Sequence, residues 1–168
     1  MFGFYFITSW TPKLLVAAGL STRQGITGGV LLNLGGIVGG SLFGFLAVRV
    51  SLKVLACVYL ALTAAGMVVF GSVATNLTAA FPTALAIGAF LFGSMVGLYA
   101  VTPLLYPAAI RTTGMGWAIG IGRIGAILAP IIAGVLVDRG WGATQLYYAF
   151  ALPLALAIVG VARLPPQP

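Results

Sequence analysis

The amino-acid sequence predicts an all-α membrane protein built from six transmembrane helices. Of its 168 residues, 61% are hydrophobic and only 5% are charged, and the mean hydropathy is +1.18. This composition leaves too little polar surface to cover a water-soluble globule. The apolar residues also gather into six runs, each near the about 20 residues that a helix needs to cross the bilayer core. The expected helices cover residues 4–20, 25–47, 54–74, 83–105, 113–137 and 145–163.

Each helix boundary follows from the polar or helix-breaking residues between two apolar runs. The first run starts directly after Met1, without the basic segment of a signal peptide, and we expect this first helix to be truncated. It ends at "STRQ" (21–24), and the later runs end at "VRVSLK" (48–53), "TNLTAAFP" (75–82), "YPAAIRTT" (106–113), "DRGWGATQ" (138–145) and "RLPPQP" (163–168). No connector is long enough for a soluble domain, so residues 1–168 are expected to form a single transmembrane domain.

Glycine is abundant, with 24 residues, and much of it lies inside the expected helices at a spacing of four. Small residues at this spacing let two helix backbones approach closely in lipid, where no hydrophobic effect drives helix association. The same faces could also let helices slide or tilt against each other. We expect close packing at the pairs Gly35/Gly39, Gly36/Gly40, Gly40/Gly44, Gly93/Gly97 and Gly116/Gly120.

The formal net charge of +7 comes from eight Lys and Arg residues against the single acid Asp138. The basic residues are scattered singly, mostly near helix ends, which is typical of anchors at the membrane interface and not of a nucleic-acid-binding surface. The positive-inside rule weakly favours placing the larger group of them in the cytoplasm. That group is Arg49, Lys53, Arg111 and Arg163, and the group at the other end is Lys13, Arg23 and Arg139.

The residues that catalysis usually needs are missing from the sequence. It contains no His and no Glu, and its one cysteine, Cys57, lies alone inside an apolar run. Neither a metal-ligand set nor an acid–base pair can be assembled from what remains. We therefore expect no metal site, no cofactor and no enzymatic activity.

Arg123 is the residue that most needs an explanation, because it lies near the middle of the apolar run 113–137. An arginine at the centre of a transmembrane helix costs about 2.5–3.5 kcal/mol on insertion scales, so such residues usually face protein or a water-filled cavity. Gly116 and Gly120 share the helix face of Arg123 at steps of three and four. We expect this face to turn toward the helix bundle or its cavity.

The counter-charge of Arg123 is left open by the sequence. Asp138, the only acid, is fifteen residues away, which is about 22 Å along a helix and too far for an ion pair. The remaining alternatives are a polar or water-filled cavity, an acid of a partner chain or missing half, and a bound anionic substrate. The planar guanidinium suits a carboxylate because it can donate two parallel hydrogen bonds.

Four further side chains are candidates for a substrate site at membrane depth. Asn33 could contact a ligand, or it could anchor one helix to another by a hydrogen bond. Tyr5, Tyr99 and Trp117 could form the apolar part of a pocket, or they could serve in packing or in the aromatic belt at the interface.

Two long segments resemble a known transporter family. The segment "YPAAIRTTGMGWAIGIGRIGAILAPIIAGVL" (106–136) resembles the region of the tenth and eleventh helices of major facilitator transporters, in particular the aromatic acid:proton symporters. The segment "FITSWTPKLLVAAGLSTRQGITGGVLLNLGGIVGGSLFGFL" (6–46) is similar to their seventh and eighth helices. The resemblance implies that the chain is the C-terminal six-helix half of such a fold, with its first helix truncated.

The resemblance also implies roles for particular residues. Arg123 matches the arginine implicated in binding the substrate carboxylate, and Arg111 matches a basic residue of the preceding cytoplasmic loop. Gly44, Arg49 and Lys53 match a gating signature between two helices, although Val48 stands where the family often has an acid.

The implied function is proton-coupled, alternating-access transport of a small aromatic carboxylate in the bacterial inner membrane. The expected partners are the lipid bilayer, a small organic anion, protons and a missing N-terminal half that carries the proton-coupling acids. The alternative is a membrane structural or assembly subunit in which Arg123 pairs with an acid of a partner chain. A channel is a third possibility. It is disfavoured because the short connectors contain no motif like a selectivity filter.

Overall fold

The computed structural model describes residues 1–74 and 76–164, and this part of the chain is helical, with no strand. Each of the six expected ranges overlaps one long helix, and the all-α prediction is confirmed. The helices are α1 (Phe2–Ala17), α2 (Thr22–Leu46), α3 (Leu52–Val73), α4 (Leu77–Val101), α5 (Arg111–Asp138) and α6 (Ala143–Ala162), with the short 3₁₀ helices η1 (Thr102–Leu105) and η2 (Ala108–Ile110) between α4 and α5.

The start of α4 differs most from the expected range, because the helix begins at Leu77 and not at residue 83. The side chain of Asn76 accepts a hydrogen bond from the backbone N–H of Thr78 at 3.1 Å. This cap satisfies a backbone donor that the helix itself leaves free, so the helix starts ahead of Pro82.

Five helical segments in the described residues are long and apolar enough to cross a membrane, which makes the chain an integral multi-pass membrane protein. They correspond to α2, α3, α4 with η1, η2 with α5, and α6. The remaining helix, α1, has 16 residues and spans about 24 Å. It is therefore shorter than the others.

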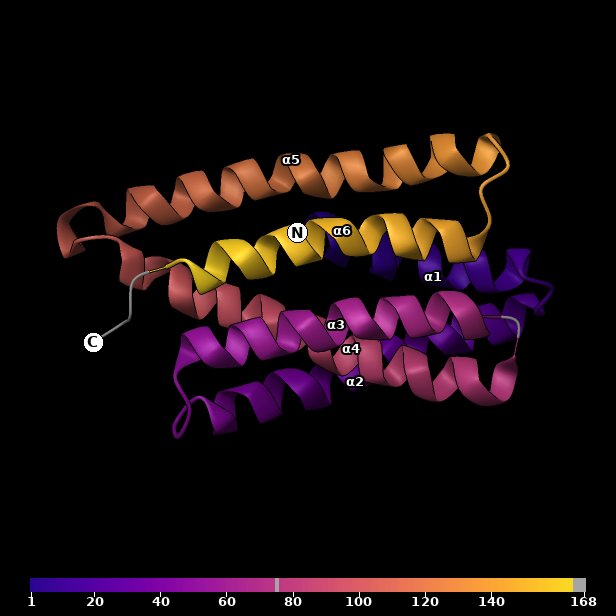
Figure 1. Cartoon of the computed structure of the whole chain (residues 1–168), viewed down its shortest axis with the longest axis horizontal. Helices are drawn as coiled ribbons and strands as arrows, with labels where there is room; N and C mark the ends of the chain where they lie inside the picture. Colours follow the sequence, from indigo (N-terminus) through magenta and orange to yellow (C-terminus); the bar gives the residue numbers. More distant parts are fainter. Residues whose placement is uncertain (75, 165–168) are drawn as a thin grey trace.

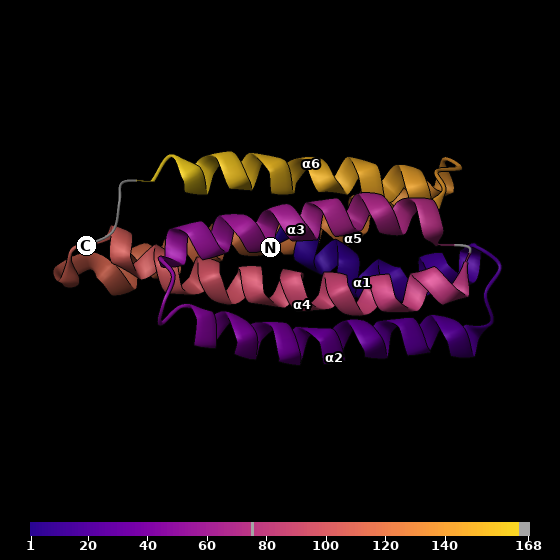
Figure 2. The same ribbon diagram turned by 60° about the horizontal axis from the view of Figure 1, so that its bottom comes forward.

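The helices lie side by side as one bundle (Figure 1). Turning the molecule shows the order α6, α3, α4 and α2 across it (Figure 2), which agrees with the contacts between successive members of that series. The short helix α1 contacts α2, α5 and α6. Helix α5 lies at the edge and makes its most extensive contact with α1.

The closest approach in the bundle is between α2 and α4. A Cβ atom added at Gly35 would overlap the backbone carbonyl of Leu85, and one added at Gly39 would overlap that of Ala89. Gly88 of α4 fits in the same way against the carbonyl of Leu32. The expected close packing at Gly35 and Gly39 is confirmed, because only glycine leaves room for backbone-to-backbone contact.

The other glycine pairs have different surroundings. Gly93 packs against the ring of Tyr59 and Gly97 against the ring of Phe43, so these two glycines make room for aromatic side chains. Gly44, Gly116 and Gly120 have no atom of the described residues within 4 Å of a Cβ position. For these last three the prediction of close packing is wrong within this chain, because no helix of the bundle lies opposite them.

A buried polar contact ties α1 to α6 inside the aromatic core. Tyr147 and Thr11 are each at most 1% exposed, and their hydroxyl oxygens lie 2.6 Å apart. Thr11 also donates to the carbonyl of Ile7 at 2.6 Å, so Tyr147 is the donor between the two hydroxyls. Both buried hydroxyl groups are therefore satisfied without leaving the apolar interior.

Candidate functional site

Arg123 lies close to the middle of α5. Twelve residues separate it from Arg111 at the start of the helix and fifteen from Asp138 at the end, distances of about 18 Å and about 22 Å. The side chain is exposed, and no hydrogen bond or ion pair joins it to another described residue. The helix thus carries a cation at mid-membrane depth that the six helices do not neutralise.

The packed face of α5 lies beside Arg123 and does not include it. A Cβ atom at Gly122 would lie 2.8 Å from the sulfur of Met1, and one at Gly125 would lie 3.4 Å from Cβ of Phe2. Ala129 and Ala133 continue this face and are fully buried. Successive residues turn by about 100° around a helix, so Arg123 lies at the edge of this contact surface between α5 and α1, which we call the seam.

Of the two surroundings expected for the face of Arg123, packing between the helices of the bundle is therefore wrong for the six helices themselves, and a position at a cavity stays a prediction. Gly116 and Gly120 share the side of Arg123 and border open space. Helix α5 packs against α1 through the buried face that contains Ala129 and Ala133, and not through the face that contains Gly116 and Gly120. Small side chains such as alanine already let two helices approach closely, and glycine is needed only for the closest contacts.

Asn33 is exposed on α2, and its side-chain amide donates to the carbonyl of Gly29 at 2.8 Å. This bond stays within one helix. Asn33 therefore does not serve as an anchor between two of the described helices, which was one of the two roles open to it.

The three aromatic candidates lie in different surroundings. Tyr5 is half-buried on α1 beside the ring of Phe4, with ring centroids 5.6 Å apart. Tyr99, 41% exposed, lines a cavity of about 200 Å³ between α4 and α5. Trp117, 70% exposed, lines a separate and open hollow of about 370 Å³ on α5. The structure therefore does not gather these side chains into one pocket.

The cavity between α4 and α5 was not foreseen from the sequence. Met95 and Leu98 of α4 face Met115 and Ile119 of α5 across it. Thr102 also borders it, with its hydroxyl donating to the carbonyl of Leu98 at 2.6 Å. These apolar residues carry no local signal of a cavity, because the space arises where two helices diverge.

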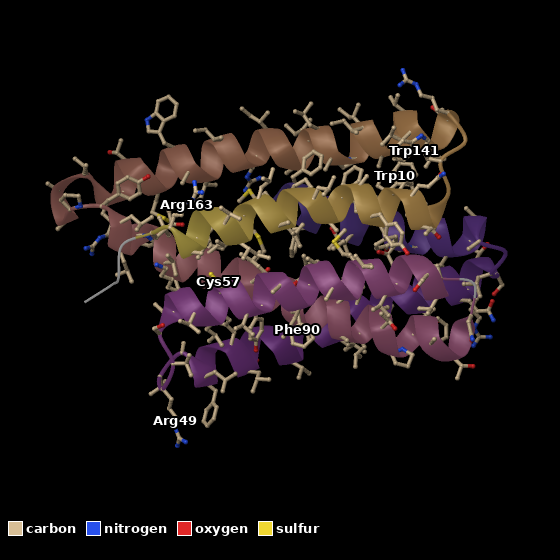
Figure 3. The ribbon with its side chains drawn as sticks, in the orientation of Figure 1. Trp10, Arg49, Cys57, Phe90, Trp141 and Arg163 are labelled. Atoms are coloured by element: carbon tan, nitrogen blue, oxygen red, sulfur yellow. The ribbon has the colours of Figure 1, made fainter. Side chains whose placement is uncertain are left out.

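The residues of the expected gate lie at one end of the bundle. Figure 3 labels Arg49 and Arg163 at this end. The guanidinium carbon of Arg49 lies 5.9 Å from the ring centroid of Phe45, and Val48, in the place of the family's acid, is 85% exposed. Gly44 and Arg111 are exposed as well. No charge latch can form within this loop, because it has no acid.

Lys53 has a specific contact that the sequence did not reveal. Its ammonium group donates to the backbone carbonyl of Leu164, which follows the end of α6. A cation at this position binds a carbonyl group just beyond the helix and also interacts favourably with the C-terminal end of the helix dipole. Lys53 therefore joins the start of α3 to the end of α6.

We predict that Lys53→Met lowers the free energy of unfolding by about 1–2 kcal/mol, the usual contribution of a charge-assisted hydrogen bond with partial burial. Thermal unfolding of the purified protein in detergent measures the change. Lys13→Met is the matched control, because Lys13 lies 5.0 Å from the ring centroid of Trp10 and makes no side-chain hydrogen bond within the described residues. Equal destabilisation by both variants would rule out a specific role of the bond to Leu164.

The described residues contain no group of three or more potential metal ligands.

Comparison with known proteins identifies relatives over nearly the whole chain. It is 32% identical over 157 residues to a benzoate transport protein of Acinetobacter baylyi, a match that covers 94% of this chain and 34% of that protein. It is 32% identical to a gallate transporter of Pseudomonas putida, covering 98% of the chain and 38% of the relative. A 4-hydroxybenzoate transporter of Pseudomonas putida is 31% identical, with coverage of 94% and 35%. No protein-family model matches the chain.

These relatives are named as transporters and not as enzymes, in agreement with the expectation drawn from the missing catalytic residues. The chain spans a little over a third of their length. Over that segment it is similar to bacterial proteins named as aromatic acid transporters, which agrees with the resemblance of its sequence to the aromatic acid symporters.

Proposed function

We propose that this chain contributes the substrate-binding arginine of a transporter for small aromatic carboxylates. The observation that carries the proposal is Arg123, which lies exposed at the middle of a transmembrane helix with no partner among the described residues. The names of the relatives, as transporters of benzoate, 4-hydroxybenzoate and gallate, support a substrate with one carboxylate on an aromatic ring.

The chemistry of this pairing is favourable at membrane depth. A carboxylate can accept two parallel hydrogen bonds from the guanidinium, and the bond strengthens where water is scarce. The aromatic ring would meet the apolar side chains around Arg123. Tyr5 of α1, Asn33 of α2, Tyr99 of α4 and Trp117 of α5 are further proposed contributors, which the six helices alone do not gather into one pocket.

We also propose that an N-terminal half completes the transporter and supplies the acids for proton coupling. Two observations support this proposal. The relatives are much longer than this chain, and α5 has a large exposed apolar surface on which Ile121 is 62% and Ile124 is 58% exposed. Two such halves pair about an axis along the membrane normal, with the site between them. Alternating access would then expose Arg123 to each side of the bacterial inner membrane in turn.

The test is uptake of radiolabelled benzoate by cells that express the chain together with its proposed N-terminal half, with Arg123 unchanged, with Arg123→Lys or with Arg123→Ala. Hydrogen bonds to a charged group contribute about 1.5–3 kcal/mol, so Arg123→Ala should lower apparent affinity by about 10- to 150-fold. Arg123→Lys should fall between, because lysine keeps the charge and loses the paired geometry. Arg139→Ala, at the end of α5, is the control and should transport normally.

A second measurement separates this role from a pairing between Arg123 and an acid of a partner chain. Benzoate should protect the purified protein against heat, whereas the uncharged analogue benzamide should not, and Arg123→Ala should abolish the protection. If benzoate gives no protection and crosslinking from α5 recovers a stable partner, Arg123 belongs to an assembly contact. Unchanged uptake by both Arg123 variants would also remove the carboxylate role.

A further inference from the structure

One end of the bundle, which we call the basic end, concentrates cations without any acid. It comprises the connector between α2 and α3, the elbow between α4 and α5, and the end of α6. The only acidic side chain of the sequence, Asp138, lies at the opposite end beside Arg139. The cations of the basic end are Arg49, Lys53, Arg111 and Arg163.

The connector between α2 and α3 also exposes large apolar side chains. Phe45, in the last turn of α2, is 65% exposed and Val48 is 85% exposed. Arg49 lies over the ring of Phe45. An exposed aromatic ring with a guanidinium above it is an amphipathic arrangement, apolar toward the acyl chains and charged toward the headgroups.

The charge of Arg49 is available to an outside partner. Lys53, four residues further on, already donates to the carbonyl of Leu164. The guanidinium of Arg49 lies over the ring of Phe45 and makes no hydrogen bond or ion pair within the described residues, and Val48 provides no carboxylate beside it. An anion that approaches this end therefore meets an uncompensated guanidinium on an apolar base.

We propose that the connector between α2 and α3 is a binding surface for anionic phospholipid, with Arg49 on the lipid phosphate and Phe45 and Val48 in the outer acyl region. Charge complementarity argues for this partner, because the basic end has cations only and a lipid leaflet with anionic headgroups supplies the opposite charge at the matching depth. The mixed apolar and cationic surface fits a lipid, which presents phosphate and hydrocarbon together.

The experiment compares phospholipids of different charge on the purified, intact protein. The protein is relipidated in phosphatidylcholine bilayers with increasing phosphatidylglycerol, and the preference for phosphatidylglycerol is measured by fluorescence quenching with brominated lipid. A cation near an anionic leaflet contributes enough that Arg49→Gln should weaken the preference about fivefold. Val48→Asp should weaken it similarly, because the new carboxylate pairs with Arg49, whereas Val48→Asn should not.

The control is Arg139→Gln at the end that carries Asp138, and it should leave the lipid preference unchanged. Unfolding temperatures in pure phosphatidylcholine check that each variant is folded. Equal quenching by the two lipids would overturn the proposal, as would an equal loss in the Arg49 and Arg139 variants. Competition by soluble inorganic phosphate as strong as by phosphatidylglycerol would also overturn it, because it would show a site for the free anion.

Discussion

Gly39→Leu is expected to destabilise the folded bundle strongly. The Cβ atom alone would overlap the carbonyl group of Ala89, and backbone atoms cannot move aside as a flexible side chain can. Separating α2 from α4 also removes the contacts at Gly35 and Gly88 along the same seam. Overpacking costs about 1–3 kcal/mol where the structure can adjust, and we expect at least about 3 kcal/mol here because the clash is with backbone. Such a loss is a large share of the about 5–15 kcal/mol that stabilises a folded domain.

Size-exclusion chromatography and thermal unfolding in detergent measure this effect. Gly44→Leu is the matched control, since it adds the same atoms to the same helix at a position where no atom of the described residues lies within 4 Å of a Cβ. The control should elute and melt as the unchanged protein does. A Gly39 variant that remained monodisperse with the original melting temperature would show that α2 and α4 do not meet through their backbones.

Ala129→Leu should have the second large effect, which is to detach α5 from α1. Ala129 is 0% exposed at the seam, and α5 makes its most extensive contact with α1. Helix α5 has few other contacts that could replace those lost when it separates from α1. We expect a loss of about 2–3 kcal/mol, together with displacement of the helix that carries Arg123.

An engineered disulfide across the seam reports the displacement directly. Cβ atoms at positions 125 and 2 would lie 3.4 Å apart, close to the about 3.8 Å that disulfides prefer. In a Cys57→Ser background, Phe2→Cys with Gly125→Cys should therefore oxidise and resist labelling by a maleimide. Adding Ala129→Leu should leave both thiols reactive.

Ala118→Leu is the control for this measurement, because it is the same substitution at an exposed alanine of α5. It should leave the disulfide intact. If the disulfide formed equally well in the Ala129→Leu variant, the seam would tolerate the larger side chain, and the position of α5 would have to depend on the elbow formed by η1 and η2.

Much of the fold can be read from local patterns. Six apolar runs define six helices, because a helix in lipid satisfies its own backbone groups and needs only length and hydropathy. The central position of Arg123 in α5 also follows from counting residues. The start of α4 is harder to predict from the sequence, because the cap at Asn76 is a single side-chain hydrogen bond and does not appear in a hydropathy pattern.

The surroundings of each residue depend on which helices meet. Gly35/Gly39 and Gly116/Gly120 have the same spacing, yet the first pair contacts α4 and the second borders open space. Lys53 and Leu164 are joined across 111 residues, with no signal in either local sequence. Spacing along a helix sets which residues share a face, and that much is local information. Which face is covered, and whether Arg123 finds a counter-charge inside the chain, depends on contacts between helices far apart in sequence.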